Sequence, residues 1–176
     1  MTGTTPALWA GRDELLLYLD FDGVLHHENV IWSASHGIQL LAPKRYTLFQ
    51  HAGLLEALLA PYPQINIVLS TSWVRQCGFV VAAERLPPEL RSRVIGATFN
   101  PAMGLTDFMS LSRGMQIALD ASQRQPHNWL ALDDDDRDWP ESDRHRLIRT
   151  HPQQGISAPA VQAQLRTQLA RLAAQA

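Results

Sequence analysis

Two residue types are nearly missing from this sequence, which has one cysteine, Cys77, and one lysine, Lys44. A single cysteine excludes an intramolecular disulfide and a zinc site made of cysteines. No apolar run approaches the ~18 residues that span a bilayer. The N-terminal segment also lacks the basic and apolar regions of a signal peptide. We therefore expect no membrane-spanning segment and a reducing, cytoplasmic setting.

Charge is also scarce in this chain. Charged residues make up 18% of the sequence, and the formal net charge is -2. Without a basic field, strong sequence-independent binding to nucleic acid is not predicted. Apolar residues make up 45% of the 176 residues, which is typical of a globular protein. This length favours a single folded domain over residues 1–176.

Short apolar runs recur along the chain and predict the strands of a sheet. Three of them have the length and composition of strands that are buried on both faces. These runs are residues 15–19, 65–69 and 129–132. Two weaker runs, at residues 94–98 and 147–150, predict further strands.

Helical patterns lie between these strands. Apolar residues at helical spacing predict helices at residues 54–59, 109–122 and 160–174. Strands that alternate with helices indicate an α/β fold, with a doubly wound, Rossmann-like parallel sheet between helical layers. Residues 26–46 are less regular and predict a loop or short flap, so we expect a minimal cap or none.

Polar side chains follow three of the predicted strands. In parallel sheets, ligands bind beyond the carboxyl edge, where the ends of the strands converge. We therefore expect the residues at these positions to face one crevice. They are Asp20 and Asp22 after the first strand, Ser70 and Thr71 after the second, and Asp133 and Asp134 after the third.

Such a group of side chains has the chemistry of phosphoryl transfer. Crowded carboxylates repel one another and need a cation or shared protons. Oxygen ligands without histidine or thiolate suit a hard ion such as Mg²⁺. A carboxylate can attack phosphorus to form an aspartyl-phosphate, and a hydroxyl or a nearby cation can bind the phosphoryl oxygens.

Residues 17–25, Leu-Tyr-Leu-Asp-Phe-Asp-Gly-Val-Leu, resemble the first motif of the haloacid dehalogenase (HAD) superfamily. The resemblance implies that Asp20 is the nucleophile and that Asp22 is the general acid and base. The apolar strand that ends in Ser70 and Thr71 is similar to the second motif, whose hydroxyl binds phosphate. Of these two residues, Thr71 is the favoured one.

The resemblance also implies a magnesium site. The acidic pair Asp133 and Asp134 matches the fourth motif. By the family pattern, the side chains of Asp20 and one of this pair bind Mg²⁺, and the backbone carbonyl of Asp22 is a third ligand. The acidic run continues along the chain, so Asp138 is an alternative for the second acid.

Arg113 fits the third motif, a lysine or arginine that binds phosphate and lies on the helix before the last motif strand. Together with Arg113, segment 71–73 (Thr-Ser-Trp) and residues 129–134 resemble a smaller HAD group that is associated with RNA-repair proteins. In that group an arginine commonly follows the tryptophan directly. In this chain Val74 separates the tryptophan from Arg75.

The second aspartate of the first motif distinguishes between reaction classes. Superfamily dehalogenases lack an acid at the position of Asp22, because a halide leaves without a proton. Phosphonatases need a Schiff-base lysine, for which Lys44 gives no support. The sequence therefore predicts a Mg²⁺-dependent phosphomonoesterase that acts through an aspartyl-phosphate. The alternative is a catalytically inactive HAD-like module that binds phosphate or a partner.

The short inserts predict an open crevice that admits bulky phosphate esters. The expected partner is a phosphorylated substrate, either a small molecule or a nucleic-acid end, and no obligate protein partner is predicted. His26 and His27 lie just beyond the first motif, either against the substrate or in an exposed loop. Trp73 is a candidate for the wall of the pocket.

Overall fold

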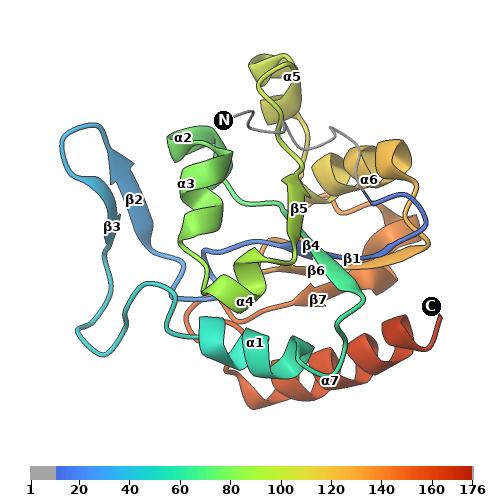
Figure 1. The fold of residues 1–176 in the computed structure, drawn as a ribbon. Helices are drawn as coiled ribbons and strands as arrows, with labels where there is room; N and C mark the ends of the chain where they lie inside the picture. Colours follow the sequence, from blue (N-terminus) through green and yellow to red (C-terminus); the bar gives the residue numbers. More distant parts are fainter. Residues whose placement is uncertain (1–10, 176) are drawn as a thin grey trace, which may run out of the picture.

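A parallel sheet of five strands forms the centre of the protein (Figure 1). The computed structural model describes residues 11–175. The strands are ordered β5-β4-β1-β6-β7, and each neighbouring pair is parallel. Each lies within one residue of a range predicted from the sequence. Their bounds are Leu15–Leu19 (β1), Ile65–Leu69 (β4), Val94–Ala97 (β5), Asn128–Asp133 (β6) and Leu147–Arg149 (β7).

Strand β1 lies in the middle of the sheet, and all of its side chains are buried. Leu15, Leu17 and Leu19 pack into the core on one face of the sheet, whereas Leu16 and Tyr18 pack into a second cluster. Burial on both faces explains why the strand reads as a continuous apolar run rather than an alternating one.

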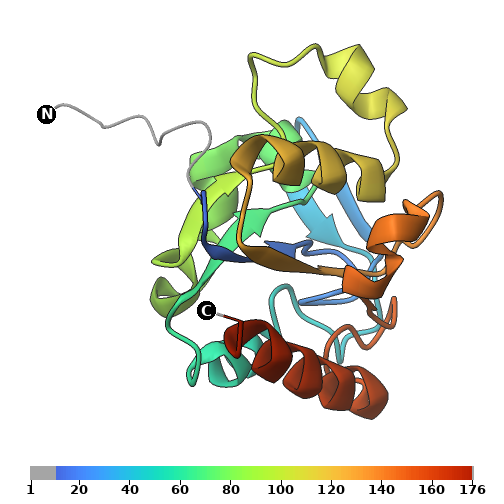
Figure 2. The ribbon, with the colours of Figure 1, turned by 90° about the vertical axis from the view of Figure 1, so that its right-hand side faces the viewer.

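Helices cover both faces of the sheet (Figure 2). Helix α1 (Ala52–Leu59) and helix α7 (Pro159–Ala173) cover one face, and helix α6 (Arg113–Arg124) covers the other. The apolar stripes of α1 and α7 join the larger core, whereas Ile117 and Ala121 of α6 join the smaller cluster. The predicted doubly wound α/β fold is therefore confirmed.

The helix predicted at residues 109–122 is wrong in its extent, because the structure has two helices there. Helix α5 (Leu105–Ser110) ends at Leu111, which has an extended backbone. Ser112 then caps helix α6 by accepting a hydrogen bond from the backbone N–H of Met115. A serine with this role marks a helix start, and the apolar spacing alone does not reveal it.

Four short helices lie where the sequence analysis assigned no structure. None of them is longer than six residues, which is too short for an apolar period to appear. They are α2 (Trp73–Cys77), α3 (Phe79–Glu84), α4 (Pro88–Arg91) and the 3₁₀ helix η1 (Glu141–Arg146).

The segment predicted as a loop or flap contains a small hairpin. Strands β2 (Val30–Ser33) and β3 (Gly37–Leu40) pair antiparallel. Gly37 has a φ of 66° at the start of β3, a conformation that glycine adopts at little cost. The hairpin projects from the body of the protein (Figure 1), and Ile31 and Trp32 are exposed on it.

No helix within residues 11–175 combines the length and the apolar character that crossing a membrane requires. The expectation about a signal peptide rests mainly on residues 1–10. These lie outside the described residues.

A buried polar network joins the central strand to helix α6. One carboxylate oxygen of Asp120 accepts a hydrogen bond from the Tyr18 hydroxyl at 2.8 Å and another from Arg124 Nε at 2.6 Å. Arg124 also donates to the backbone carbonyl of Ala97 at 3.2 Å. The network therefore links β1, α6 and the end of β5.

We expect Asp120→Ala to destabilise the protein strongly. The substitution would leave the buried Arg124 guanidinium without its carboxylate, a loss that costs ~3–5 kcal/mol. Urea denaturation of both proteins measures the change in the free energy of unfolding. Asp107→Ala, at an exposed site on α5, is the control and should change it by less than about 0.5 kcal/mol. An equal effect of the two substitutions would contradict a stabilising role for the network.

Candidate active site

The register of the sheet brings three strand ends together. Leu19 of β1 pairs with Leu69 of β4 on one side and with Leu132 of β6 on the other. The next residues along these strands, Asp20, Ser70 and Asp133, therefore lie side by side at the carboxyl edge. The convergence expected from the sequence is present in the structure.

Three carboxylates form a compact group at this edge. Oxygen atoms of Asp20, Asp133 and Asp134 all lie within 4.8 Å of one another. Asp20 and Asp133 are buried, and Asp134 is partly buried. The side chains of Asp22 and Asp138 do not belong to the group. For Asp22 this agrees with the family pattern, which uses only its backbone carbonyl. For Asp138, the alternative second acid, it favours the pair Asp133 and Asp134 instead.

Burial makes the ionised forms of these carboxylates costly. It raises the pKa of Asp20 to about 6, and the charge of Asp22 contributes to this rise. Burial and the charge of Asp20 raise the pKa of Asp134 to about 7 and the pKa of Asp133 well above its usual value. Acids in this arrangement ionise together only if a cation is close.

Arg113, the first residue of α6, lies against two of the carboxylates. Its Nη2 atom is 3.8 Å from Asp20 Oδ2, and its Nε atom is 3.1 Å from Asp133 Oδ2. Burial opposes the charge of Arg113, but Asp20 and Asp133 outweigh that effect and raise its pKa. The arginine to which the family resemblance assigns phosphate binding is therefore next to the predicted nucleophile. It offsets one of the three negative charges.

The remaining negative charge fits a hard divalent cation. Asp133 Oδ2 is buried and, apart from its ion pair with Arg113, accepts no hydrogen bond within the described chain. The group offers only carboxylate oxygens, which are the ligands that Mg²⁺ prefers over nitrogen and sulfur. Asp20, Asp133 and Asp134 are the residues that would hold the ion.

Gly23 makes room for one of these carboxylates. Its φ is +69°, and a Cβ atom there would lie 2.5 Å from Cγ and Oδ2 of Asp134. Both the backbone conformation and the close approach therefore require glycine. The Thr150 hydroxyl donates a hydrogen bond to the backbone carbonyl of Gly23 at 2.7 Å. This bond helps to fix the turn.

Asp22 is held by two side chains. Trp73 Nε1 donates to Asp22 Oδ1 at 2.9 Å, and His26 Nε2 lies 3.0 Å from the same oxygen. His26 Nδ1 accepts a hydrogen bond from the backbone N–H of Phe49 at 3.2 Å. Because Nδ1 is the acceptor, the proton of a neutral ring is on Nε2. Both contacts therefore donate to one oxygen of Asp22 and leave the other available.

A comparison with protein families places the chain in a known family. The family model described as "HAD domain in Swiss Army Knife RNA repair proteins" matches residues 16–161. The chain belongs to this family. The resemblance to the HAD superfamily and to its RNA-repair group, inferred from the motifs, is thereby confirmed. Neither the comparison with curated proteins nor that with solved structures finds a match.

Both candidate phosphate-binding hydroxyls of this HAD domain are buried at the end of β4. A hydrogen bond from Thr71 stabilises the ionised form of Asp20 and lowers its pKa, as does one from the backbone N–H of Phe21. The Ser70 hydroxyl has no hydrogen-bond partner within the described residues. The choice between Thr71 and Ser70 stays a prediction.

Sequence reasoning missed how Asp22 is positioned. The sequence predicts His26 and His27 either against the substrate or in an exposed loop. In the structure both side chains are buried. His27 packs against Tyr46, with ring centroids 4.8 Å apart. The short spacing from Asp22 to His26 is a signal that could have been used. The contact with Trp73 joins residues 51 positions apart, which a single sequence does not reveal.

We expect Mg²⁺ to stabilise the protein more at pH 8 than at pH 5. The pKa values of Asp20 and Asp134 are raised to about 6 and about 7. Without metal, the stability contributed by these groups therefore falls as pH rises through those values. The ion binds the ionised forms. At 100 times its dissociation constant it should add ~2.7 kcal/mol, or roughly 5–10 °C in Tm.

Thermal unfolding with and without Mg²⁺ at the two pH values measures this effect. Asp133→Asn should abolish the shift, whereas Asp107→Asn, at an exposed site on α5, should keep it. A shift that is independent of pH, or that survives in Asp133→Asn, would count against a metal site at this edge.

Proposed function

We propose that this HAD domain is a Mg²⁺-dependent phosphohydrolase that forms an aspartyl-phosphate on Asp20. The observation that carries the proposal is the group formed by the buried Asp20 and Asp133 and the partly buried Asp134 at the ends of two adjacent strands. A structural role for three such carboxylates is hard to justify, because burial makes each ionised form costly. Bound Mg²⁺ would offset the negative charge of these acids and of the phosphoryl oxygens.

In the first step, a carboxylate oxygen of Asp20 forms a bond to phosphorus, and the bond from phosphorus to the leaving oxygen breaks. Asp20 Oδ1 accepts the backbone N–H of Phe21 at 2.8 Å, whereas Oδ2 faces Arg113. We assign the attack to Oδ2. Arg113, together with Thr71 or Ser70, would bind the phosphoryl oxygens.

Asp22 supplies the proton for this step. Its Oδ1 atom is occupied by Trp73 and His26, so we assign proton transfer to Oδ2. The protonated acid gives its proton to the leaving oxygen. In the second step, the carboxylate takes a proton from the water that attacks phosphorus, and Asp20 is released.

The description of the matched family supports a nucleic-acid substrate. The matched family is described by RNA repair, and the insert after β1 is only a hairpin. We therefore propose a phosphorylated partner, either a small molecule or a nucleic-acid end, with the nucleic-acid end favoured.

We expect Asp20→Asn to abolish phosphate release from an aryl phosphate, because the amide is a poor nucleophile. Asp22→Asn should lower kcat by ~10²–10⁴. Its loss should be smaller for a substrate whose leaving group needs no proton. Steady-state assays with two aryl phosphates of different leaving-group pKa measure both effects.

Asp136→Asn is a matched control, because Asp136 belongs to the same acidic run but pairs with Arg149 at 3.1 Å. It should retain activity. Retained activity in Asp20→Asn would overturn the assignment of the nucleophile. An equal loss with both leaving groups in Asp22→Asn would overturn the assignment of the acid.

A further inference from the structure

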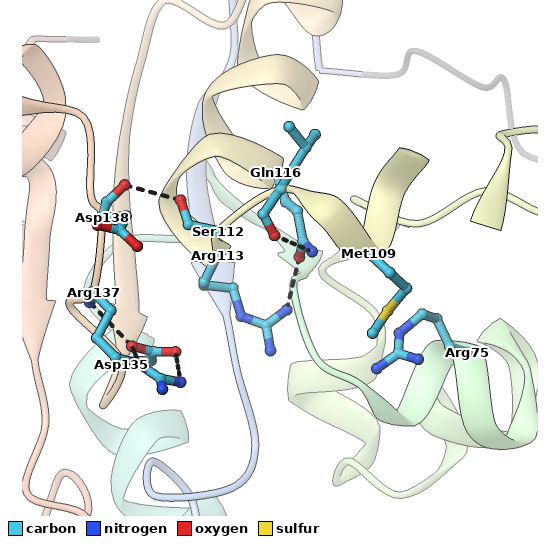
Figure 3. A pocket seen from close by; sticks show the side chains of 9 residues that line it. Arg75, Met109, Ser112, Arg113, Gln116, Asp135, Arg137 and Asp138 are labelled. Atoms are coloured by element: carbon cyan, nitrogen blue, oxygen red, sulfur yellow. Dashed lines mark hydrogen bonds and ion pairs between the residues drawn. The ribbon is translucent and has the colours of Figure 1, made fainter. Parts of the chain in front are cut away.

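A cleft beside Arg113 has no role in the chemistry described above (Figure 3). Its volume is about 320 Å³, near the lower end of the range for ligand sites, ~300–1,000 Å³. Residues of α2, α5, α6 and the loop after β6 line it. Arg113 lines this cleft and also contacts Asp20 and Asp133, so the cleft adjoins the position proposed for the transferred phosphate.

Three arginines line the cleft, and two of them are paired with carboxylates. Arg113 contacts Asp20 and Asp133. Arg137 makes two hydrogen bonds to the carboxylate of Asp135, at 2.9 and 2.8 Å. Arg75 makes no ion pair within residues 11–175. Of the three arginines in the cleft, it is therefore the one whose charge is not offset by a carboxylate of these residues.

The surroundings of Arg75 favour an anion. Arg75 is partly buried, and its burial and the charge of Arg113 lower its pKa. An arginine remains protonated in spite of such a shift, so its charge is held near a like charge. Asp138 is a further acid in the lining. In Figure 3 it lies with the Arg137–Asp135 pair on one side of Arg113, whereas Arg75 lies on the other.

We propose that Arg75 forms a subsite for a second phosphate group of the substrate, next to the phosphate ester that Asp20 attacks. The proposal rests on the proposed function, because it places the reacting phosphate at Asp20. A guanidinium binds phosphate through two parallel hydrogen bonds. Met109 and Leu111 add apolar surface to the cleft, which suits the sugar that connects the two phosphates and the base attached to it.

Two sources could supply the second phosphate. One is the internucleotide phosphate of a strand whose terminal phosphate is removed. The other is a small bisphosphate. The family's connection with RNA repair favours the strand, and the substrates of the test separate the two sources.

The test compares two dinucleotides that carry the same terminal phosphate. One has the ordinary charged internucleotide linkage, and the other has a neutral methylphosphonate linkage. With the full chain and Mg²⁺, wild-type kcat/KM should favour the charged linkage by roughly tenfold, the effect of one charge-assisted hydrogen bond. Arg75→Gln should bring this ratio close to one, and Arg75→Lys should give an intermediate value. Arg91→Gln, at an exposed site on α4, should keep the wild-type ratio.

A nucleoside bisphosphate and the matching mononucleotide form the second pair. If Arg75→Gln removes a preference for the bisphosphate and not for the charged dinucleotide, the subsite exists and its ligand is a small molecule. If Arg75→Gln changes neither the dinucleotide ratio nor the bisphosphate ratio, the proposal of a subsite is overturned.

A failure of the proposed function would give a different result. In that case, wild-type protein hydrolyses none of the substrates, and binding replaces turnover as the readout. Affinities of the two dinucleotides for the wild-type and Arg75→Gln proteins are then compared. Discrimination that depends on Arg75 supports the subsite, and discrimination that is the same in both proteins overturns it.

Discussion

Strand β1 is paired in register with β4 on one side and with β6 on the other. This pairing places the residues at the carboxyl ends of the strands in one buried space, and two of them are the aspartates Asp20 and Asp133. Buried carboxylates need nearby positive charge. Arg113 supplies a single charge, which does not balance Asp20, Asp133 and Asp134. The imbalance favours a bound dication, and the chemistry proposed for the site depends on it.

Helix α6 connects this site to the stability of the fold. Its first residue, Arg113, contacts Asp20, and two turns later Asp120 binds Tyr18, which lies two positions before Asp20 in β1. Helix α6 and the end of β1 are therefore joined at two points. Asp22 is fixed from another direction, by Trp73 at the start of α2 and by His26. The nucleophile and the acid are thus held by separate parts of the core.

The strands and the acidic residues could be predicted from the sequence, because burial on both faces leaves a continuous apolar run and each run ends in a polar residue. The hairpin at 30–40 and the division between α5 and α6 could not, because the segments are short and depend on single turn or capping residues. The contacts of Asp22 and the unpaired charge of Arg75 depend on packing between segments far apart in the chain. A single sequence does not encode that packing in any local pattern.

The most direct test of the account is a crystal structure with Mg²⁺ and fluoroberyllate, which mimics a phosphoryl group. The account predicts the beryllium group on Asp20, in contact with Arg113 and a hydroxyl at the end of β4. It also predicts the metal ion between Asp20 and the pair Asp133 and Asp134. A metal ion bound elsewhere, or a trapped group away from Asp20, would contradict it.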